Sequence, residues 1–282
     1  MQAAPPPAIS SPAVAANPSP ALPIGMIQSP CPPPVPPSAV TVAVIGAVLK
    51  PGPLDPVLMA RYLAPALVAE RNKADAEQRQ RDWPNLCRYK AANAALAKGP
   101  PLRAVFIGDS LTEAWQTGDA KLFRDGVVGR GISGQTSPQI LLRFYPDVIA
   151  LKPKVVHILC GVNDIAGNTG PNSARDYENN IMAMVTLAKA NGIKVVLGSL
   201  TPTNNLYWSA AKDPAAIILE LNAWLKRYAA QAGVSFVDYY TPLVGNDGAF
   251  PSKYSNEGVH ANMAGYDVMR PLAEAALRKA ER

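Results

Sequence analysis

The stretch that decides the fold is Arg103-Ala104-Val105-Phe106-Ile107-Gly108-Asp109-Ser110-Leu111, an apolar run that ends in a polar turn. A short apolar run rich in β-branched and aromatic residues predicts a buried strand, here Arg103–Ile107. Working outward along the chain, further short apolar runs of the same kind predict four more strands. These are Val127–Ile132, Val155–Cys160, Lys194–Leu200 and Ser235–Tyr239.

Stretches with helical character separate the predicted strands, at about residues 136–150, 173–191, 214–232 and 262–281. Alternation of short strands with helices predicts an α/β fold, a parallel sheet with helices on both faces. In such sheets the ligand site lies beyond the carboxyl ends of the strands. We therefore look for functional residues directly after each strand.

The chain before residue 101 has a different composition. Residues 1–37 hold 13 of the 29 prolines and little apolar bulk, which predicts a disordered, Pro-rich tail. The charged and apolar pattern of residues 54–98 predicts amphipathic helices, with Asp82 as the N-cap of a second one. We expect three parts: the tail 1–37, a helical extension 38–100 that packs on the core, and the α/β domain 101–282.

The composition limits the partners and the location of the protein. The net charge is +6, but aromatic residues do not alternate with the few tight cationic groups, so we expect no nucleic acid. The longest apolar run, Ala39–Leu49, is too short to span a bilayer, so we expect no stable membrane insertion. Residues 1–37 lack the basic start and apolar core of an intact signal peptide. We expect a secreted or periplasmic protein whose signal peptide has been removed, with a cytoplasmic protein as the alternative.

Four polar clusters follow the predicted strands or precede the last helix. They are Gly108–Leu111, Ser133–Ser137, Gly161–Asp164 and Glu257–His260. Since the carboxyl ends of parallel strands meet at one edge of the sheet, we expect the four clusters to lie together there.

These clusters, in this order, resemble the blocks of the SGNH hydrolases, also called GDSL esterases and lipases. The resemblance runs from about residue 102 to residue 282. It implies a flavodoxin-like three-layer α/β/α sandwich whose five-stranded parallel sheet has the order 2-1-3-4-5, here preceded by the helical extension. It also implies a functional role for Ser110, Gly134, Asn163 and His260.

The chemistry of these residues agrees with the resemblance. A serine hydroxyl is a poor nucleophile until a base takes its proton, and His260 is the credible base for Ser110. The other histidine, His157, lies in an apolar strand and is interpreted as a buried core residue. The N–H groups of Ser110 and Gly134, with the side-chain amide of Asn163, are the predicted oxyanion donors.

One position departs from the family pattern. The family usually has aspartate three residues before the histidine, where this sequence has Glu257. A carboxylate there orients the imidazole and stabilises the imidazolium, so we expect Glu257 to complete a triad. If Glu257 misses the imidazole, a backbone carbonyl orients His260 and the site works as a dyad. Asp109 and Asp164 are expected to hold turns rather than to act as acid or base.

The competing prediction is a dinucleotide-binding oxidoreductase, because Gly129-Arg130-Gly131-Ile132-Ser133-Gly134 matches the fingerprint G-x-G-x-x-G. The next strand ends Leu159-Cys160-Gly161, without the carboxylate that would hold a ribose. The match also follows the second strand rather than the first. We therefore expect no cofactor and, with only two histidines in the chain, no metal site.

We expect a serine esterase that hydrolyses short-chain oxygen esters, acetyl to butyryl, through an acyl-enzyme on Ser110. The segments around Ser133 and Leu141–Pro171 resemble bacterial relatives of platelet-activating-factor acetylhydrolase subunits. A small-molecule or glycan ester is the expected substrate. A carbohydrate (xylan-type) O-acetylesterase and an acyltransferase are the alternatives within the family. Aromatic residues near the site suggest sugar stacking or ordinary packing: Trp115, Tyr207, Trp208, Phe250 and Tyr254.

Overall fold

The computed structural model describes residues 31–33 and 35–282. Most of the tail predicted for residues 1–37, namely residues 1–30 and 34, therefore lies outside the described residues. Residues 35–282 form a single compact unit, which contains all the helices and strands described below.

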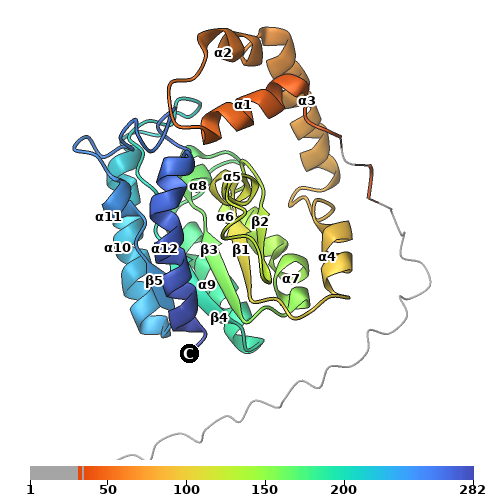
Figure 1. Ribbon diagram of the computed structural model, residues 1–282, viewed down its shortest axis with the longest axis vertical. Coiled ribbons are helices and arrows are strands. Elements are labelled where there is room, and N and C mark those ends of the chain that lie inside the picture. The colour runs from red at the N-terminus through yellow and green to blue at the C-terminus, as the bar shows by residue number, and fades with distance from the viewer. Residues whose placement is uncertain (1–30, 34) are drawn as a thin grey trace, which may run out of the picture. The chain divides into compact units, whose positions relative to one another are not determined.

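Five parallel strands form the sheet at the centre of this unit (Figure 1). The strand order β2-β1-β3-β4-β5 confirms the predicted order, and β1 lies between β2 and β3. β4 and β5 end earlier than predicted. The strands are β1 (Ala104–Gly108), β2 (Val127–Gly131), β3 (Val155–Leu159), β4 (Lys194–Gly198) and β5 (Ser235–Val237).

Helices cover both faces of the sheet, and β1 and β3 are therefore buried along their whole length. Alternate residues of β1 enter different cores: Val105 and Ile107 enter one, and Ala104 and Phe106 enter the other. The first core is completed by α9 (Ala174–Ala190) and α10 (Pro214–Ala232). The second is completed by α5 (Ser110–Gly118) and α12 (Met263–Ala280). The predicted three-layer sandwich is thereby confirmed.

The helix predicted for residues 136–150 is broken. It consists of α6 (Ser137–Leu142), α7 (Phe144–Asp147) and a 3₁₀ turn (Ile149–Leu151). Two local causes coincide at the break. Arg143 has φ −95° and ψ 2°, outside the helical region, and Pro146 has no N–H to donate to the preceding turn. The short helices α8 (Val162–Ala166) and α11 (Tyr240–Leu243) follow β3 and β5.

His157 is a core residue, as predicted. It lies in the middle of β3, has no exposed surface, and stacks on Phe106 with ring centroids 4.3 Å apart. Its Nε2 atom is 2.9 Å from the Tyr239 hydroxyl. Burial lowers the pKa of His157 to about 3, so the ring is neutral at physiological pH. His157 therefore contributes packing and one buried hydrogen bond.

Four helices precede the sheet: α1 (Ala39–Leu49), α2 (Pro56–Tyr62), α3 (Pro65–Arg81) and α4 (Lys90–Leu96). Figure 1 shows α1, α2 and α3 together beyond one end of the sheet. The predicted role of Asp82 is wrong. Its carboxylate accepts hydrogen bonds from the N–H groups of Leu86 and Cys87, at 2.9 and 2.8 Å, and so closes the turn between α3 and α4. Along residues 31–33 and 35–282, no helix combines the length and the hydropathy needed to cross a bilayer.

α4 is joined to the sheet by buried polar contacts. The Asn93 carboxamide donates to the Pro146 carbonyl at 3.1 Å and to Asp147 Oδ1 at 2.7 Å. Its oxygen accepts a hydrogen bond from Arg130 Nε at 2.8 Å. Nearby, the Tyr89 hydroxyl donates to the Gly131 carbonyl at the end of β2. The described part of the extension thus makes specific polar contacts with the α/β core.

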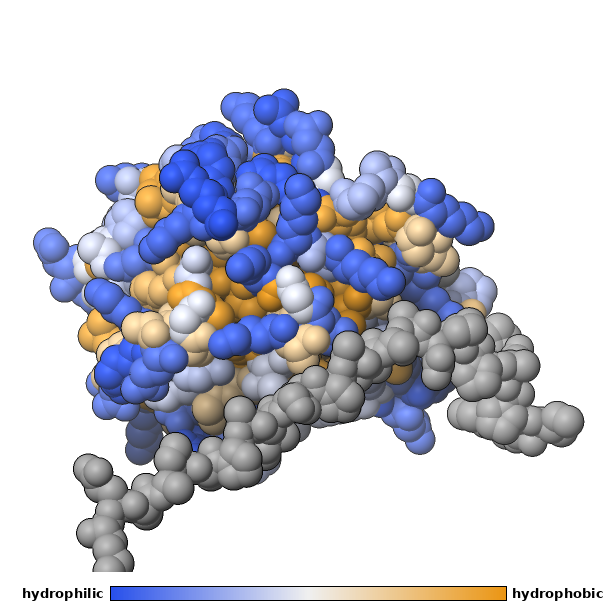
Figure 2. All heavy atoms as spheres, turned by 90° about the horizontal axis from the view of Figure 1, so that it is seen from below, coloured by the Kyte–Doolittle hydropathy of each residue, from blue (hydrophilic) through white to orange (hydrophobic). Residues whose placement is uncertain are grey.

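Figure 2 shows the molecule from below the view of Figure 1, where hydrophilic side chains ring an apolar area. A shallow hollow at the amino-terminal ends of β4 and β5 is lined by Lys189, Lys194 and Lys279. Lys189 donates to the Ala232 carbonyl at 2.7 Å at the end of α10, which is the usual place for a lysine beside the negative end of a helix. None of the predicted site residues lines this hollow.

Asn93→Ala is expected to destabilise the protein by about 2–3 kcal/mol, because it leaves the buried atoms Arg130 Nε and Asp147 Oδ1 without their hydrogen-bond partner. Thermal unfolding followed by circular dichroism measures the change. Asn191→Ala is the matched control, since Asn191 is exposed and bonds only within its own helix end; it is expected to change stability by less than about 0.5 kcal/mol. Equal melting temperatures for both variants would contradict the anchoring role of Asn93.

Candidate active site

The turn after β1 presents Ser110 at the first position of α5. Gly108 is required there, because a Cβ atom would collide with the Leu159 carbonyl and the Thr112 hydroxyl. Asp109 then caps the helix, its Oδ1 accepting from the Leu111 N–H at 3.0 Å. The expectation that Asp109 holds this turn is confirmed. The close packing of β1 against the end of β3 and the first turn of α5 therefore determines where Ser110 lies.

Ser110, His260 and Glu257 form a continuous chain of hydrogen bonds. Ser110 Oγ is 2.9 Å from His260 Nε2, and His260 Nδ1 is 3.0 Å from Glu257 Oε1. The serine and the histidine are 150 positions apart in the sequence, so only the fold joins them. The side chain of His260 is 26% exposed, which leaves one side of the pair open to a substrate.

The loop before α12 explains how Glu257 reaches the imidazole from a position where the family usually has an aspartate. Glu257 Oε1 also accepts hydrogen bonds from the N–H groups of Val259, at 3.1 Å, and of His260. The loop turns at Gly258, which has φ +87°, and the Gly258 N–H donates to Ser255 Oγ at 2.9 Å. Wrapping the longer side chain back onto its own loop brings Oε1 to the imidazole.

The electrostatics of the pair favour a charged imidazole. Burial alone would lower the pKa of His260, but the hydrogen bond and the negative charge of Glu257, with a contribution from Asp109, raise it above the usual value of 6.5. Burial would raise the pKa of Glu257, yet the contacts with His260 hold it below its usual value. A base with a raised pKa holds the proton taken from serine more firmly.

The loops after β2 and β3 bring Gly134 and Asn163 together. Gly134 has φ +76°, a conformation that residues with a side chain rarely adopt, and the nearest atom to a Cβ placed there would be Asn168 Nδ2 at 4.0 Å. Asn163, buried at the start of α8, donates from Nδ2 to the Gln135 carbonyl at 3.0 Å. Asn168 Nδ2 contacts both loops, the Gly134 carbonyl at 3.3 Å and Asn163 Oδ1 at 2.7 Å.

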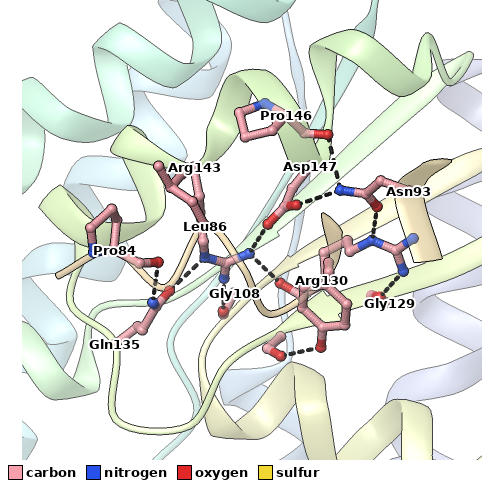
Figure 3. Close-up of polar contacts among 12 residues, drawn as sticks. Pro84, Leu86, Asn93, Gly108, Gly129, Arg130, Gln135, Arg143, Pro146 and Asp147 are labelled. Atoms are coloured by element: carbon pink, nitrogen blue, oxygen red, sulfur yellow. Dashed lines mark hydrogen bonds and ion pairs between the residues drawn. The ribbon is translucent and has the colours of Figure 1, made fainter. Parts of the chain in front are cut away.

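A buried guanidinium lies behind these loops (Figure 3). Arg143 has no exposed surface and pairs with Asp147 at 2.9 Å. It donates to the Gly108 carbonyl at 2.7 Å and to Gln135 Oε1 at 2.5 Å. Burial lowers the pKa of Arg143, against the opposing effect of Asp147. The guanidinium therefore connects the turn that carries Ser110 to the loop that carries Gly134.

Asp164 joins two helices rather than holding its own turn, which differs from the expectation. Both of its carboxylate oxygens accept the Ser137 N–H at 3.0 Å, and Ser137 Oγ donates to one of them. Burial raises the pKa of Asp164 to about 6 and that of Asp109 to about 7, against the hydrogen bonds from Ser137 and Leu111 respectively. The contacts of Asp164 attach α6 to α8, and the contact of Asp109 attaches the turn before Ser110 to α5.

The candidate aromatic residues separate into two groups. Trp115 and Phe250 are core residues, so the stacking interpretation is wrong for both, and Tyr254 is partly buried against the same core. Tyr207 and Trp208 are 67% and 41% exposed and pack edge to face at 4.9 Å. Trp208 Nε1 donates to Asn168 Oδ1 at 2.9 Å, which places this pair beside the loops of Gly134 and Asn163.

Two residues of the site were missed in the sequence analysis. Arg143 was detectable as a lone charge between Leu142 and Phe144 in an apolar stretch, where a cation needs buried partners. Asn168 carried no such signal, because asparagine is common in loops.

The glycines of the dinucleotide fingerprint have a different role. Gly129 and Gly131 lie within β2 rather than in a loop. A Cβ atom at Gly129 would collide with Gln116, and one at Gly131 with the Glu113 backbone N. Both residues allow α5 to approach the sheet closely.

Comparison with known proteins identifies the family. The model of the GDSL-like lipase/acylhydrolase family matches residues 106–268, more than half of the chain. A protein from Bacteroides fragilis described as an acylhydrolase is 44% identical, with a TM-score of 0.68, over 71% of this chain and 99% of its own. A GDSL-like lipase from Bacteroides thetaiotaomicron is 43% identical, also with a TM-score of 0.68, over 71% and 100%. This chain belongs to the GDSL-like lipase/acylhydrolase family and is a carboxylic ester hydrolase.

Two further proteins are less similar to this chain or match a smaller part of it. An acetylxylan esterase from Geobacillus stearothermophilus, 20% identical over 64% of this chain and 95% of its own with a TM-score of 0.51, shares the fold. An uncharacterized lipoprotein of Bacillus subtilis is 33% identical over 79 residues. That match spans 27% of this chain and about a third (32%) of the curated relative's length.

Glu257→Gln is expected to shift the acid limb of the pH–rate profile to lower pH. Neutral His260 is the active form, so activity rises as pH passes through its pKa, which Glu257 raises. Without the carboxylate that pKa falls, while the maximal kcat drops on the order of 10²- to 10⁴-fold. The measurement is kcat/KM from pH 4 to 9. Glu274→Gln, a partly exposed glutamate on α12, is the control. An unchanged acid limb would show that Glu257 does not act on His260.

Proposed function

We propose that this protein is a serine esterase that hydrolyses short-chain oxygen esters through an acyl-enzyme on Ser110. The observation that carries the proposal is the hydrogen-bonded series Ser110 Oγ, His260 and Glu257, with distances of 2.9 and 3.0 Å. A nucleophile, a base and a group that orients the base is the arrangement that acyl transfer requires.

In the first half of the reaction His260 Nε2 takes the proton of Ser110 as Oγ attacks the ester carbonyl carbon. Collapse of the tetrahedral intermediate breaks the bond to the alcohol oxygen, and His260 gives the proton to the leaving alcohol. In the second half a water molecule attacks the acyl-enzyme while His260 takes its proton. The acid leaves, the proton returns to Ser110 Oγ, and the enzyme is restored.

The oxyanion is stabilised by the N–H groups of Ser110 and Gly134 and by the Asn163 side chain. Two observations support these roles. Neither N–H group has an acceptor in the contacts found among residues 31–33 and 35–282. Asn163 Nδ2 uses one of its two hydrogens on Gln135, so the second is free for a substrate oxygen. Donors held in place before the reaction lower the barrier most.

The acyl group is acetyl to butyryl. The loops at the carboxyl edge of the sheet are rich in small and polar residues, particularly Ile165–Asn172 and Thr201–Asp213, and they offer no long apolar trough. Methylene groups left in water gain none of the ~0.8 kcal/mol that burial of each would give. A glycan O-acetyl ester is the second candidate substrate, supported by the exposed pair Tyr207 and Trp208. The match to a lipoprotein supports a location outside the cytoplasm.

Ser110→Ala is expected to lower kcat by up to about 10⁶-fold, because the nucleophile is lost. The melting temperature should stay within about 2 °C of the wild type, as one hydroxyl is removed at a partly exposed position. The assay is release of acetate from p-nitrophenyl acetate, together with mass spectrometry after treatment with an organophosphate.

The adduct is expected on the peptide that contains Ser110 and to be absent from the variant. Ser133→Ala is the control, since Ser133 bonds to Glu113 and takes no part in the proposed proton transfer. More than a tenth of wild-type turnover in a pure Ser110→Ala preparation would overturn the assignment of the nucleophile.

For p-nitrophenyl esters from C2 to C12, kcat/KM is expected to fall steadily beyond about C4. Turnover should be the same with and without EDTA. Initial rates below the solubility limit of each ester measure the trend. Faster cleavage of C10 or C12 than of C2 to C4 would mean that a long acyl chain is bound, and would make the enzyme a lipase in the stricter sense.

A further inference from the structure

Every side-chain amide can rotate by 180° and exchange its oxygen and nitrogen at almost no intrinsic cost. If Asn163 is an oxyanion donor, as proposed above, its nitrogen must face the substrate in nearly every molecule. We propose that Asn168 is the positioning residue that holds Asn163 in this orientation, and that Trp208 in turn holds Asn168. The inference rests on the proposed role of Asn163 and extends it.

The contacts of Asn163 distinguish its two orientations. Its Oδ1 accepts from Asn168 Nδ2 at 2.7 Å, and its Nδ2 donates to the Gln135 carbonyl at 3.0 Å. In the rotated state Oδ1 would face the Gln135 carbonyl oxygen, and Nδ2 would face the Asn168 amino group. Two hydrogen bonds would become two repulsive contacts at a residue that is 3% exposed.

Asn168 can hold Asn163 in one orientation only if its own amide is oriented, and Trp208 orients it. An indole N–H can only donate, so its partner must be an oxygen. Trp208 Nε1 is 2.9 Å from Asn168 Oδ1, which leaves Asn168 Nδ2 for the Gly134 carbonyl at 3.3 Å and for Asn163. The indole N–H of Trp208 therefore fixes the orientation of the Asn168 amide, and Asn168 in turn fixes that of Asn163.

The backbone holds Asn168 in reach of Asn163. Gly167 caps the end of α8, and its φ of +69° turns the chain back, so that the Asn168 N–H donates to the Asn163 carbonyl at 3.1 Å. On the far side, Arg79 of α3 lies 3.5 Å from the Asn168 carbonyl. Asn168 thus contacts the Asn163 loop, the Gly134 loop, the exposed Tyr207–Trp208 pair and the N-terminal helices.

The test is a double-mutant cycle with p-nitrophenyl acetate. Asn163→Ala is expected to lower kcat by about 10²- to 10³-fold. Asn168→Ala, which frees the Asn163 amide to rotate, is expected to lower kcat by about tenfold with KM within about twofold. In the Asn163→Ala background, Asn168→Ala is expected to cost less than about twofold more, because its target is gone.

Trp208→Phe keeps an aromatic ring but removes the N–H donor. It is expected to lower kcat by about threefold in the wild type, and to add less than about twofold in Asn168→Ala. Asn191→Ala, remote from the site, is the control. It should leave kcat, KM and the melting temperature as in the wild type.

Equal losses of kcat from Asn168→Ala in both backgrounds would overturn the positioning role, as would a wild-type kcat for Asn168→Ala. A fall in melting temperature with unchanged kcat would make Asn168 structural only. If Asn163→Ala itself keeps wild-type kcat, the oxyanion role of Asn163 fails and the inference fails with it. The nucleophile assignment is judged separately, by Ser110→Ala.

Discussion

The candidate site depends on one buried charge. Arg143 has no exposed surface, and a guanidinium removed from water is tolerated only where nearly every donor has a partner. Its partners are Asp147, the Gly108 and Arg130 carbonyls at the ends of β1 and β2, and Gln135. Meeting that requirement brings the nucleophile turn and the Gly134 loop into one arrangement.

Around this centre the polar groups of the site orient one another. Glu257 Oε1 contacts the imidazole of His260, whose Nε2 meets Ser110 Oγ, and Asn168 Nδ2 contacts the carboxamide oxygen of Asn163. Hydrogen bonds of this kind add little net stability, because water would satisfy the same groups in the unfolded chain. Their effect is to select one geometry, and preorganised geometry is what lowers the barrier of acyl transfer.

The helices before the sheet also contact the catalytic edge. The carboxamide of Asn256, next to Glu257, donates to the carbonyls of Ala47, Val48 and Lys50 at the end of α1. Arg79 of α3 approaches Asn168 on the other side. The two similar Bacteroides structures are matched over nearly their full length by 71% of this chain. This chain is therefore longer than those structures, and its helices α1 and α3 each contact a loop of the candidate site.

The sequence alone determined the strand–helix alternation and the order of the four blocks, because these follow from local hydrophobic pattern and residue chemistry. Through the family resemblance it also indicated Ser110 and His260 as the candidate nucleophile and base. It also indicated His157 as a core residue from its apolar strand. Only the tertiary structure decided that Glu257 reaches His260, that Gly129 and Gly131 serve packing, and that Arg143 and Asn168 join the loops. Those facts depend on atoms far apart in the chain, such as Arg143 Nη2 and the Gly108 carbonyl, 35 positions away, and no local pattern encodes such a distance.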